Sequence, residues 1–430
     1  MSDRHAAAIG KAIDEVTVID PHCHLRLAKP AADNLADIVL YHHVWIELVS
    51  SGMDEREVSK AGLPHECADP GIPPRERVRR ALPYLANIRN TTLGLYLRWV
   101  LQDLYGLDAA LTEGNLDKAW AVVEKKGRDP AWQEELLRGR CRIECSISVE
   151  HGSEPYCERM LRGREWAPFR LDFGKQSPAD VLADMDKTLG RALASADDYR
   201  EFLAKGVESL PLDDLRFLGF WLSPHLTNAQ VRDADVTAII GKVRDGVPLA
   251  QAELGSFAFF GMVNALEALK QTGLRTIQVI VGANCLPPHR AITYYGQNLT
   301  EALGRVAGAF PAFHFNTSSA SDQYTQDLGV LAKHVPNISV AGYWWHTLYP
   351  FYIRKSIETR LDMVPMNKIV AFFSDAYHAE WCYPKLKMVK QLWAEILTER
   401  VEKGWLTLET ALALVRAVFY ENPKRIYRIP

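Results

Sequence analysis

The sequence predicts a (β/α)8 TIM-type barrel, and three observations support this fold class. Eight strand-like runs alternate with helix-like segments along the 430 residues. Several runs, such as 277–281 and 369–373, are apolar on both faces, as parallel strands buried on both sides require. The length suffices for one large barrel. A doubly wound parallel sheet is the structural alternative, because strand count alone does not separate the two architectures.

The elements of this fold are bounded by changes from apolar to polar sequence. The strand candidates are 16–24, 142–150, 166–173, 215–223, 276–283, 312–319, 338–345 and 368–376. Helical patterns between them span 178–189, 228–243, 255–272 and 323–333. The first of these helices has clear start signals, because Ser177 can cap its amino terminus and Pro178 suits its first position.

Two segments lie outside the regular alternation. The segment 26–139 is too long for a simple connection and is rich in Leu, Trp and Tyr, so we expect a helical insertion after the first strand. The segment 384–430 predicts helices packed outside the barrel. We therefore expect residues 1–430 to form a single barrel domain that contains the insertion and ends in extra helices.

Charge and composition argue against several classes of partner. The formal net charge is −3 and no basic run with interleaved aromatic residues is present, so we expect no nucleic-acid binding. No apolar run approaches the length that spans a membrane, and the first residues form no apolar signal core. The seven cysteines are scattered without a C-x-x-C motif, which predicts reduced thiols and a cytoplasmic location.

The carboxyl ends of the strands carry the active site in (β/α)8 barrels, and two of these ends hold candidate metal ligands. His22 and His24 end the first strand, where alternation places both imidazoles on one face. Asp375 ends the eighth strand, which neighbours the first in a closed barrel. This donor set suits one divalent cation, with Zn²⁺ favoured and Mn²⁺ or Fe²⁺ as alternatives. The simpler interpretations are a histidine pair without metal and an aspartate that caps a helix.

Other residues near these strand ends have two interpretations each. Arg170 is either a substrate contact or the partner of Asp172 in a structural ion pair. Trp344 and Trp345 are either core residues or an apolar platform for the face of a sugar. Cys23 lies between the two histidines and is expected to point the other way, which argues against a catalytic thiol.

Five short motifs, spread over nearly the whole chain, point to a known family. They are Ile19–His24, Tyr41–His43, Phe169–Asp172, Pro336–Trp345 and Phe373–Asp375. With these motifs the chain resembles the amidohydrolase superfamily of metal-dependent barrels and, within it, the uronate isomerase branch. His-x-His is shared by the superfamily, whereas Asn-x-x-x-x-Gly-x-Trp-Trp and the histidine pair in the insertion are typical of this branch.

The resemblance implies a metal-dependent aldose–ketose isomerase that acts on a hexuronate or related sugar by proton transfer through an enediol. It implies one bound divalent metal, usually Zn²⁺, and a small sugar or sugar acid as substrate. The resemblance implies metal ligands at His22, His24 and Asp375 and substrate contacts from His42, Arg170, Trp344 and Trp345. We further expect Asp375, His42 and His43 to be the catalytic groups, and Tyr377 and His378 to contact the substrate.

The sequence departs from the usual pattern of this branch at several positions. Tyr377 stands where an arginine is usual, His43 where a tyrosine is usual, and Ile280 where many members carry histidine. The arginine common after the sixth strand is missing from the run 319–321. Because arginine suits carboxylate recognition, a neutral or modified sugar is an alternative substrate. The alternative functions are a metal-dependent hydrolase or lyase and a barrel without catalysis, and assembly into a homo-oligomer is left open.

Overall fold

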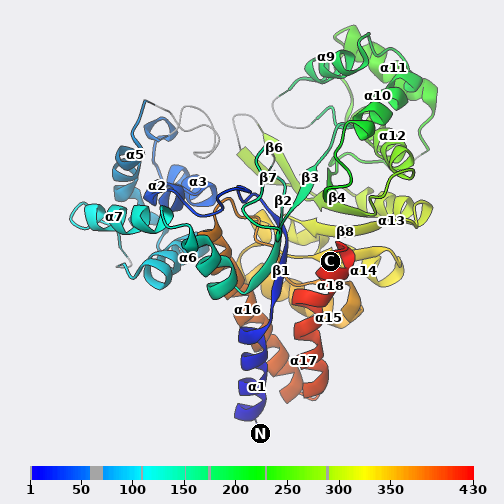
Figure 1. Cartoon of the computed structure of the whole chain (residues 1–430). Helices are drawn as coiled ribbons and strands as arrows, with labels where there is room; N and C mark the ends of the chain where they lie inside the picture. Colours follow the sequence, from blue (N-terminus) through cyan, green and yellow to red (C-terminus); the bar gives the residue numbers. More distant parts are fainter. Residues whose placement is uncertain are drawn as a thin grey trace. The chain divides into compact units, whose positions relative to one another are not determined.

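Eight parallel strands form the central sheet of the protein (Figure 1). A computed structural model describes residues 2–58, 71–107, 110–150, 152–172, 176–227, 230–286 and 290–430. The strand order is β1-β2-β3-β4-β5-β8-β9-β10, so the neighbours in the sheet follow one another in chain order. A doubly wound sheet instead reverses its strand order at a switch point. The predicted (β/α)8 class is therefore confirmed over its alternative.

Five of the eight strands lie within two residues of their predicted bounds, and the third, seventh and eighth differ more. They are β1 Val18–Cys23, β2 Ile143–Ser148, β3 Met160–Glu165, β4 Leu215–Trp221, β5 Thr276–Val281, β8 His314–Ser319, β9 Ile338–Ala341 and β10 Ile369–Val370, with the antiparallel hairpin β6 Ala283–Leu286 and β7 Arg290–Thr293 after β5. The predicted position of the third strand is wrong. Prediction set it at 166–173, but 166–172 is a loop and Phe173 lies outside the described residues. The true strand, Met-Leu-Arg-Gly-Arg-Glu, is half-buried and lacks the apolar run that guided the prediction.

The last two strands end earlier than predicted. β9 stops at Ala341, and Trp345–Thr347 forms a 3-10 turn instead of extending it. β10 has only two residues, and 371–376 continues without helix or strand structure. The first predicted helix is confirmed in detail, because Pro178–Leu189 begins with the Ser177 side chain accepting a hydrogen bond from the backbone N–H of Asp180.

The chain divides into two compact units. Unit 1 comprises 1–160, 348–354 and 372–420, and unit 2 comprises 161–347, 355–371 and 421–430. The helices of unit 1 are α1 Ser2–Glu15, α2 Leu35–Val39, α3 His42–Ser50, α5 Pro74–Ala81, α6 Thr92–Trp99, α7 Leu116–Gly127, α8 Ala131–Glu134, α16 Ala379–Glu402 and α17 Leu408–Arg416. Those of unit 2 are α9 Pro178–Leu189, α10 Ala196–Glu208, α11 Asp233–Arg244, α12 Gln251–Leu269, α13 Leu299–Ala309, α14 Thr325–His334 and α18 Asn422–Ile426, and α15 Pro350–Met363 has residues in both ranges.

Short 3-10 and π-helical turns connect several of these helices. The 3-10 turns are Glu55–Glu57, Leu82–Ile88, Asp322–Tyr324, Trp345–Thr347 and Met366–Lys368, and the π-helical turns are Val100–Leu104, Glu135–Arg140 and Ala417–Glu421. The predicted helix 228–243 is observed as Asp233–Arg244, and Asn228 lies outside the described residues. None of the helices in the described ranges is long and apolar enough to cross a membrane.

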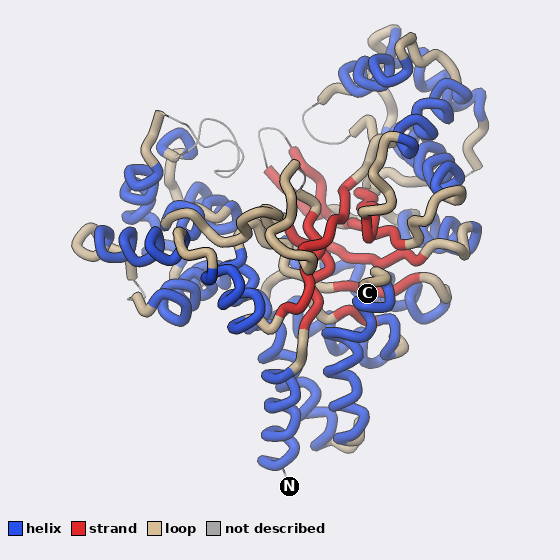
Figure 2. The backbone as a smooth tube through the Cα atoms, in the orientation of Figure 1, coloured by secondary structure: helices blue, strands red, loops and turns tan. Residues whose placement is uncertain are grey.

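Within unit 1, α1 leads into β1 and packs on the carboxyl-terminal helices. It runs alongside α16 and α17 (Figure 2). Ile9 and Ile13 on α1 are fully buried, at the i, i+4 spacing that places two side chains on one helical face. The amino-terminal helix therefore fixes the start of the strand that carries His22.

Within unit 2, the last residues of the chain close the amino-terminal side of the strands. Tyr427 follows α18 and is fully buried. Its hydroxyl donates to Asn316 Oδ1 on β8 at 2.5 Å and accepts from Gln278 Nε2 on β5 at 2.8 Å. The Thr276 hydroxyl donates to the carbonyl of Ile426 at 2.6 Å. These hydrogen bonds satisfy buried polar groups and anchor α18 beneath β5 and β8.

Candidate metal centre

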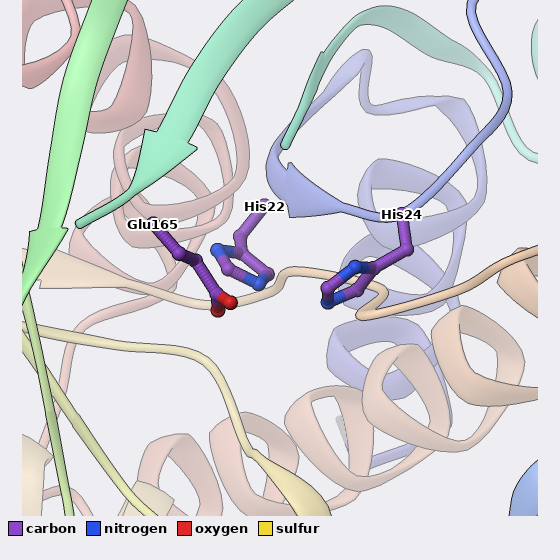
Figure 3. Close-up of side chains that lie close together, drawn as sticks. All are labelled: His22, His24 and Glu165. Carbon is purple, nitrogen blue, oxygen red and sulfur yellow. The ribbon is translucent and has the colours of Figure 1, made fainter. Parts of the chain in front are cut away.

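β1 delivers two imidazoles to one place at its carboxyl end. His22 lies in the strand and His24 just beyond it, and their rings project to the same side (Figure 3). The ring centroids are 5.4 Å apart, with planes inclined at 77°. Cys23 points away, and its Sγ lies 3.5 Å from the carbonyl oxygen of Ile147 on β2. The alternation expected from the sequence therefore holds locally.

Asp375 reaches these imidazoles because the segment after β10 runs beside β1. The backbone N–H of Asp375 donates to the carbonyl of His22 at 3.0 Å, and that of His24 donates to the carbonyl of Ala376 at 2.9 Å. Asp375 Oδ1 lies 3.5 Å from Nε2 of His22 and 3.5 Å from Nε2 of His24. Burial alone would raise the pKa of Asp375, but the two imidazoles outweigh it and hold the pKa well below its usual value.

The distances from the two imidazole nitrogens to the Asp375 oxygen fit a small divalent cation. Donor atoms about 2.1 Å from a tetrahedral ion lie about 3.4 Å from one another. The two Nε2–Oδ1 distances of 3.5 Å match this separation. Nδ1 of His24 lies 3.4 Å from Glu150 Oε1, the kind of contact that orients a metal-binding imidazole. The donor set, two neutral nitrogens and one carboxylate, suits Zn²⁺ and leaves a coordination position for a further ligand.

A buried polar layer holds Asp375 in place. Asp375 has a φ of +49°, a left-handed conformation that costs an ordinary residue about 1–2 kcal/mol. Its carbonyl accepts hydrogen bonds from Lys385 Nζ at 3.2 Å and from the Tyr41 hydroxyl at 3.1 Å. Lys385 Nζ also donates to the carbonyl of Ser374 at 2.7 Å and to the Tyr41 oxygen at 3.0 Å. Burial lowers the pKa of Lys385, opposed by the nearby Asp375 carboxylate.

Asp20 ties the same layer to β1. Both the backbone N–H and the hydroxyl of Ser374 donate to its carboxylate, at 2.8 Å and 2.6 Å. Burial raises the pKa of Asp20 to about 6, against the lowering effect of these hydrogen bonds. Sequence reasoning missed Asp20, Tyr41 and Lys385. Asp20 follows the strand-like run 16–19, but the sequence does not show its partner, and the burial of Lys385 is visible only in the structure.

The predicted acid–base residues lie beside the candidate metal ligands. His42 and His43 begin α3, and both are buried. The Tyr377 ring stacks on His24, with centroids 4.4 Å apart and planes at 10°, and meets His42 edge-on at 4.8 Å. His378 directly precedes α16. Unit 1 therefore brings together seven of the ten predicted site residues, namely His22, His24, His42, His43, Asp375, Tyr377 and His378.

A small cavity adjoins this cluster. Its volume is about 30 Å³, and its lining includes Tyr41, Arg77, Tyr377 and His378. This volume suffices for one or two water molecules. The guanidinium of Arg77, contributed by α5 of the inserted segment, is a cation at the edge of the cluster that sequence reasoning did not single out.

The other predicted substrate contacts lie in unit 2. The fully buried Arg170 side chain donates through Nε to Asp172 Oδ1 at 2.8 Å, so the structural ion pair considered from the sequence is present. Trp344 is buried and meets Trp221 edge-on at 4.8 Å. Trp345 is less buried, and its φ of +46° turns the chain after β9. Trp344 therefore packs against Trp221, and its predicted substrate contact stays a prediction.

Comparison with known proteins relates the whole chain to one group of enzymes. No protein-family model matches the chain. It is 20% identical to the uronate isomerase of Thermotoga maritima, over 99% of this chain and 98% of that protein. The crystal structure of the Thermotoga maritima uronate isomerase matches with a TM-score of 0.80 at 16% identity, over 99% of this chain and 97% of that one. The glucuronate isomerase from Caulobacter crescentus also gives 0.80, at 18% identity over 100% and 94% of the two chains.

These likenesses extend over the whole barrel and its additional helices. The structural matches confirm the fold, and the full-length match to curated uronate isomerases confirms the resemblance predicted from the sequence motifs. The low identity agrees with the departures noted above at Tyr377 and His43.

Proposed function

We propose that this chain, a divergent relative of the uronate isomerases, is an isomerase that interconverts a hexuronate and the corresponding ketose. The observation that carries the proposal is the approach of Nε2 of His22 and of His24 to one oxygen of Asp375, each at 3.5 Å. The full-length similarity to uronate isomerases supports the reaction type.

His22, His24 and Asp375 would hold one divalent cation, and Zn²⁺ suits this donor set best. When bound, such a cation supplies positive charge that stabilises the oxyanion developing on the sugar during the reaction. The protein contributes the rigid geometry. Lys385 and Tyr41 fix the backbone of Asp375, and Glu150 orients His24.

The reaction moves two protons within the sugar. The C2–H bond breaks and a C1–H bond forms, while the proton on O2 is lost and O1 gains one, so no external oxidant or reductant is needed. Asp375 can accept and return the hydroxyl proton. His42 and His43 are the proposed acid–base groups for the carbon-bound proton, because imidazole exchanges protons near neutral pH.

Substrate contacts are proposed on the basis of the family resemblance. Tyr377 and His378 lie two and three positions after Asp375 in the chain. Arg170, Trp344 and Trp345 of unit 2 stay proposed contacts, although the charge of Arg170 is already paired with Asp172. Because Tyr377 supplies an aromatic face instead of a guanidinium, the substrate acid is expected to rely on other cations, and the test below includes a neutral sugar.

The test is isomerisation in D₂O by protein reconstituted with Zn²⁺, followed by ¹H NMR. D-glucuronate and D-galacturonate are the test substrates, and D-glucose is the neutral comparison. We expect ketose formation, or exchange of the C2 proton for deuterium, with at least one hexuronate. Asp375→Asn should abolish it, whereas Cys23→Ala should retain it, because Cys23 lies between the ligands but faces Ile147. If wild-type protein converts neither hexuronate, the proposed hexuronate isomerase activity is wrong. If it converts glucose alone, the substrate is a neutral sugar.

We further propose a cytoplasmic location. The cysteines whose side chains are described, Cys23, Cys141, Cys145, Cys157 and Cys382, are all free, as a reducing compartment favours. Fractionation of the source cells with an antibody tests this location, and recovery outside the cytoplasmic fraction contradicts it.

A further inference from the structure

Unit 2 contains a second cavity, at the amino-terminal ends of its strands. It lies where β5, β8 and β9 begin, and its other walls come from the end of α13 and from α18. Its volume is about 540 Å³. Sites for small molecules commonly fall between about 300 and 1,000 Å³. The cavity is therefore large enough for a small metabolite, and none of the residues discussed for the metal centre lines it.

The wall of this cavity is strongly cationic. Arg275, Arg425 and Arg428 line it, and none of its lining residues, all in the described part of the chain, carries a carboxylate. Arg275 donates to the carbonyls of Thr272 and Leu274, and Arg425 to the carbonyl of Asn367. These acceptors are neutral. Within the described ranges, no acidic side chain forms an ion pair with any of the three arginines.

Burial and nearby positive charges both lower the pKa of the His314 imidazole. His314 begins β8 and lines the same cavity, and its Nε2 lies 2.7 Å from the Ser339 hydroxyl. Burial, together with the charges of Arg425 and Lys368, lowers the pKa of His314 to about 4. The neutral imidazole adds no charge to the cavity. No carboxylate among the described lining residues balances the three guanidinium groups.

Hydrogen bonds tie the walls of the cavity to one another. Asn337 Nδ2 donates to the carbonyls of Ala307, Phe310 and Phe313 at 2.9, 3.2 and 2.9 Å, which ties the end of α13 to the start of β9. The backbone N–H of His314 donates to the carbonyl of Arg275 at 2.7 Å. A preformed wall reduces the ordering cost of binding.

We propose that this cavity binds a phosphate group, either free or carried by a small metabolite. Guanidinium groups recognise phosphate through paired, charge-assisted hydrogen bonds. Three of them balance a dianion better than they balance the single charge of a carboxylate. This proposal is independent of the isomerase reaction, because its residues and its cavity are separate from those of the metal centre.

The test measures binding of inorganic phosphate and of glucose 6-phosphate by calorimetry in a buffer free of phosphate and sulfate, with glucose as the neutral comparison. We expect saturable binding of at least one phosphate compound and none of glucose. Equal affinity for the two identifies the free ion as a sufficient ligand, and tighter binding of the sugar phosphate identifies a metabolite. Absence of saturable binding by either compound overturns the proposal.

Single variants connect the binding to this cavity. Arg425→Gln and Arg428→Gln should each weaken the affinity about tenfold, as expected for loss of one charge-assisted contact. Arg305→Gln is the matched control, because Arg305 lies on α13, pairs with Glu301 and does not line the cavity. In a ¹H NMR titration, phosphate should raise the pKa of His314 in the wild type. Unchanged affinity in both cavity variants, or equal loss in the control, contradicts the assignment.

Discussion

Replacement of Lys385 by methionine tests the buried layer beneath the metal centre. Methionine keeps most of the side-chain volume but removes the ammonium that donates to the carbonyls of Ser374 and Asp375 and to the Tyr41 hydroxyl. Without it, Asp375 loses one of the two hydrogen bonds that its carbonyl accepts, and its φ of +49° is no longer fully supported. The carboxylate is then expected to move away from His22 and His24.

The structure sets the size of this effect. Relaxation from the left-handed conformation releases about 1–2 kcal/mol, and metal binding must supply that energy again to restore the liganding geometry. Since 1.4 kcal/mol corresponds to a factor of ten, Zn²⁺ should bind about 5- to 30-fold more weakly. Loss of a residue that orients a metal ligand typically weakens affinity to a similar extent. The free energy of unfolding should change less than the free energy of Zn²⁺ binding. Removing the buried charge of Lys385 offsets part of the cost of the lost hydrogen bonds.

The assay is competition for Zn²⁺ against a chromophoric chelator, with circular dichroism to verify folding. Lys387→Met is the matched control, because Lys387 lies two residues further along α16 and pairs with Asp103 at 2.7 Å. We expect its Zn²⁺ affinity to equal that of the wild type. Should Lys385→Met not fold, Tyr41→Phe removes the other hydrogen bond to the Asp375 carbonyl and should also weaken binding. Wild-type affinity in folded Lys385→Met protein would refute the reasoning.

Three further predictions concern other parts of the chain. Asp375→Asn removes the anionic donor and should lower Zn²⁺ affinity about 100-fold; wild-type zinc content after dialysis, measured by mass spectrometry, would contradict the assignment. His314 has a folded-state pKa near 4, so the folded protein binds fewer protons than the unfolded chain between pH 6.5 and 4. Stability should therefore fall by up to about 3 kcal/mol as the pH drops through this window, and urea unfolding of His314→Gln should lack this loss. A Cβ added at Gly255 would lie 1.7 Å from the carbonyl oxygen of His225, whereas one at Gly241 meets nothing within 4 Å. Gly255→Ala should lower the free energy of unfolding by about 3 kcal/mol, and Gly241→Ala should raise it by about 1 kcal/mol, as measured by thermal unfolding. Equal effects would show that the backbone near His225 shifts to accept the added methyl group.

The sequence was sufficient to predict most of the fold, because buried parallel strands leave a strong local signal. The composition of β5, Thr-Ile-Gln-Val-Ile-Val, predicts a buried strand without further information. The composition of β3 does not, because Arg162 and Arg164 sit within a half-buried strand and the more apolar stretch that follows is a loop. The sequence did not indicate the early end of β10 either. Its chain leaves the β9 ladder after Val370 and then bonds to β1, and this change of partner depends on tertiary contacts.

The convergence of His22, His24 and Asp375 was predictable for a related reason. Strand alternation places His22 and His24 on one face, and barrel closure brings the end of the eighth strand beside the first. The residues that support them were not predictable, because Lys385, Tyr41 and Asp20 act through backbone carbonyls and a serine. Such contacts place no demand on local sequence pattern. The arginine-lined cavity was missed because Arg275 and Arg425 are far apart in the chain.

The hydrogen bonds between Asp20 and Ser374 join positions 354 residues apart. At ordinary rates of translation, about 20–70 s pass between synthesis of the two residues. During that time the growing chain carries the two histidines without the carboxylate that completes the centre. If these residues hold a cation as proposed, an ion encountered early meets only the two imidazoles, and stable binding must await a nearly finished polypeptide. Such long-range pairing also predicts slow folding, which makes this enzyme a candidate for chaperone assistance in the cell.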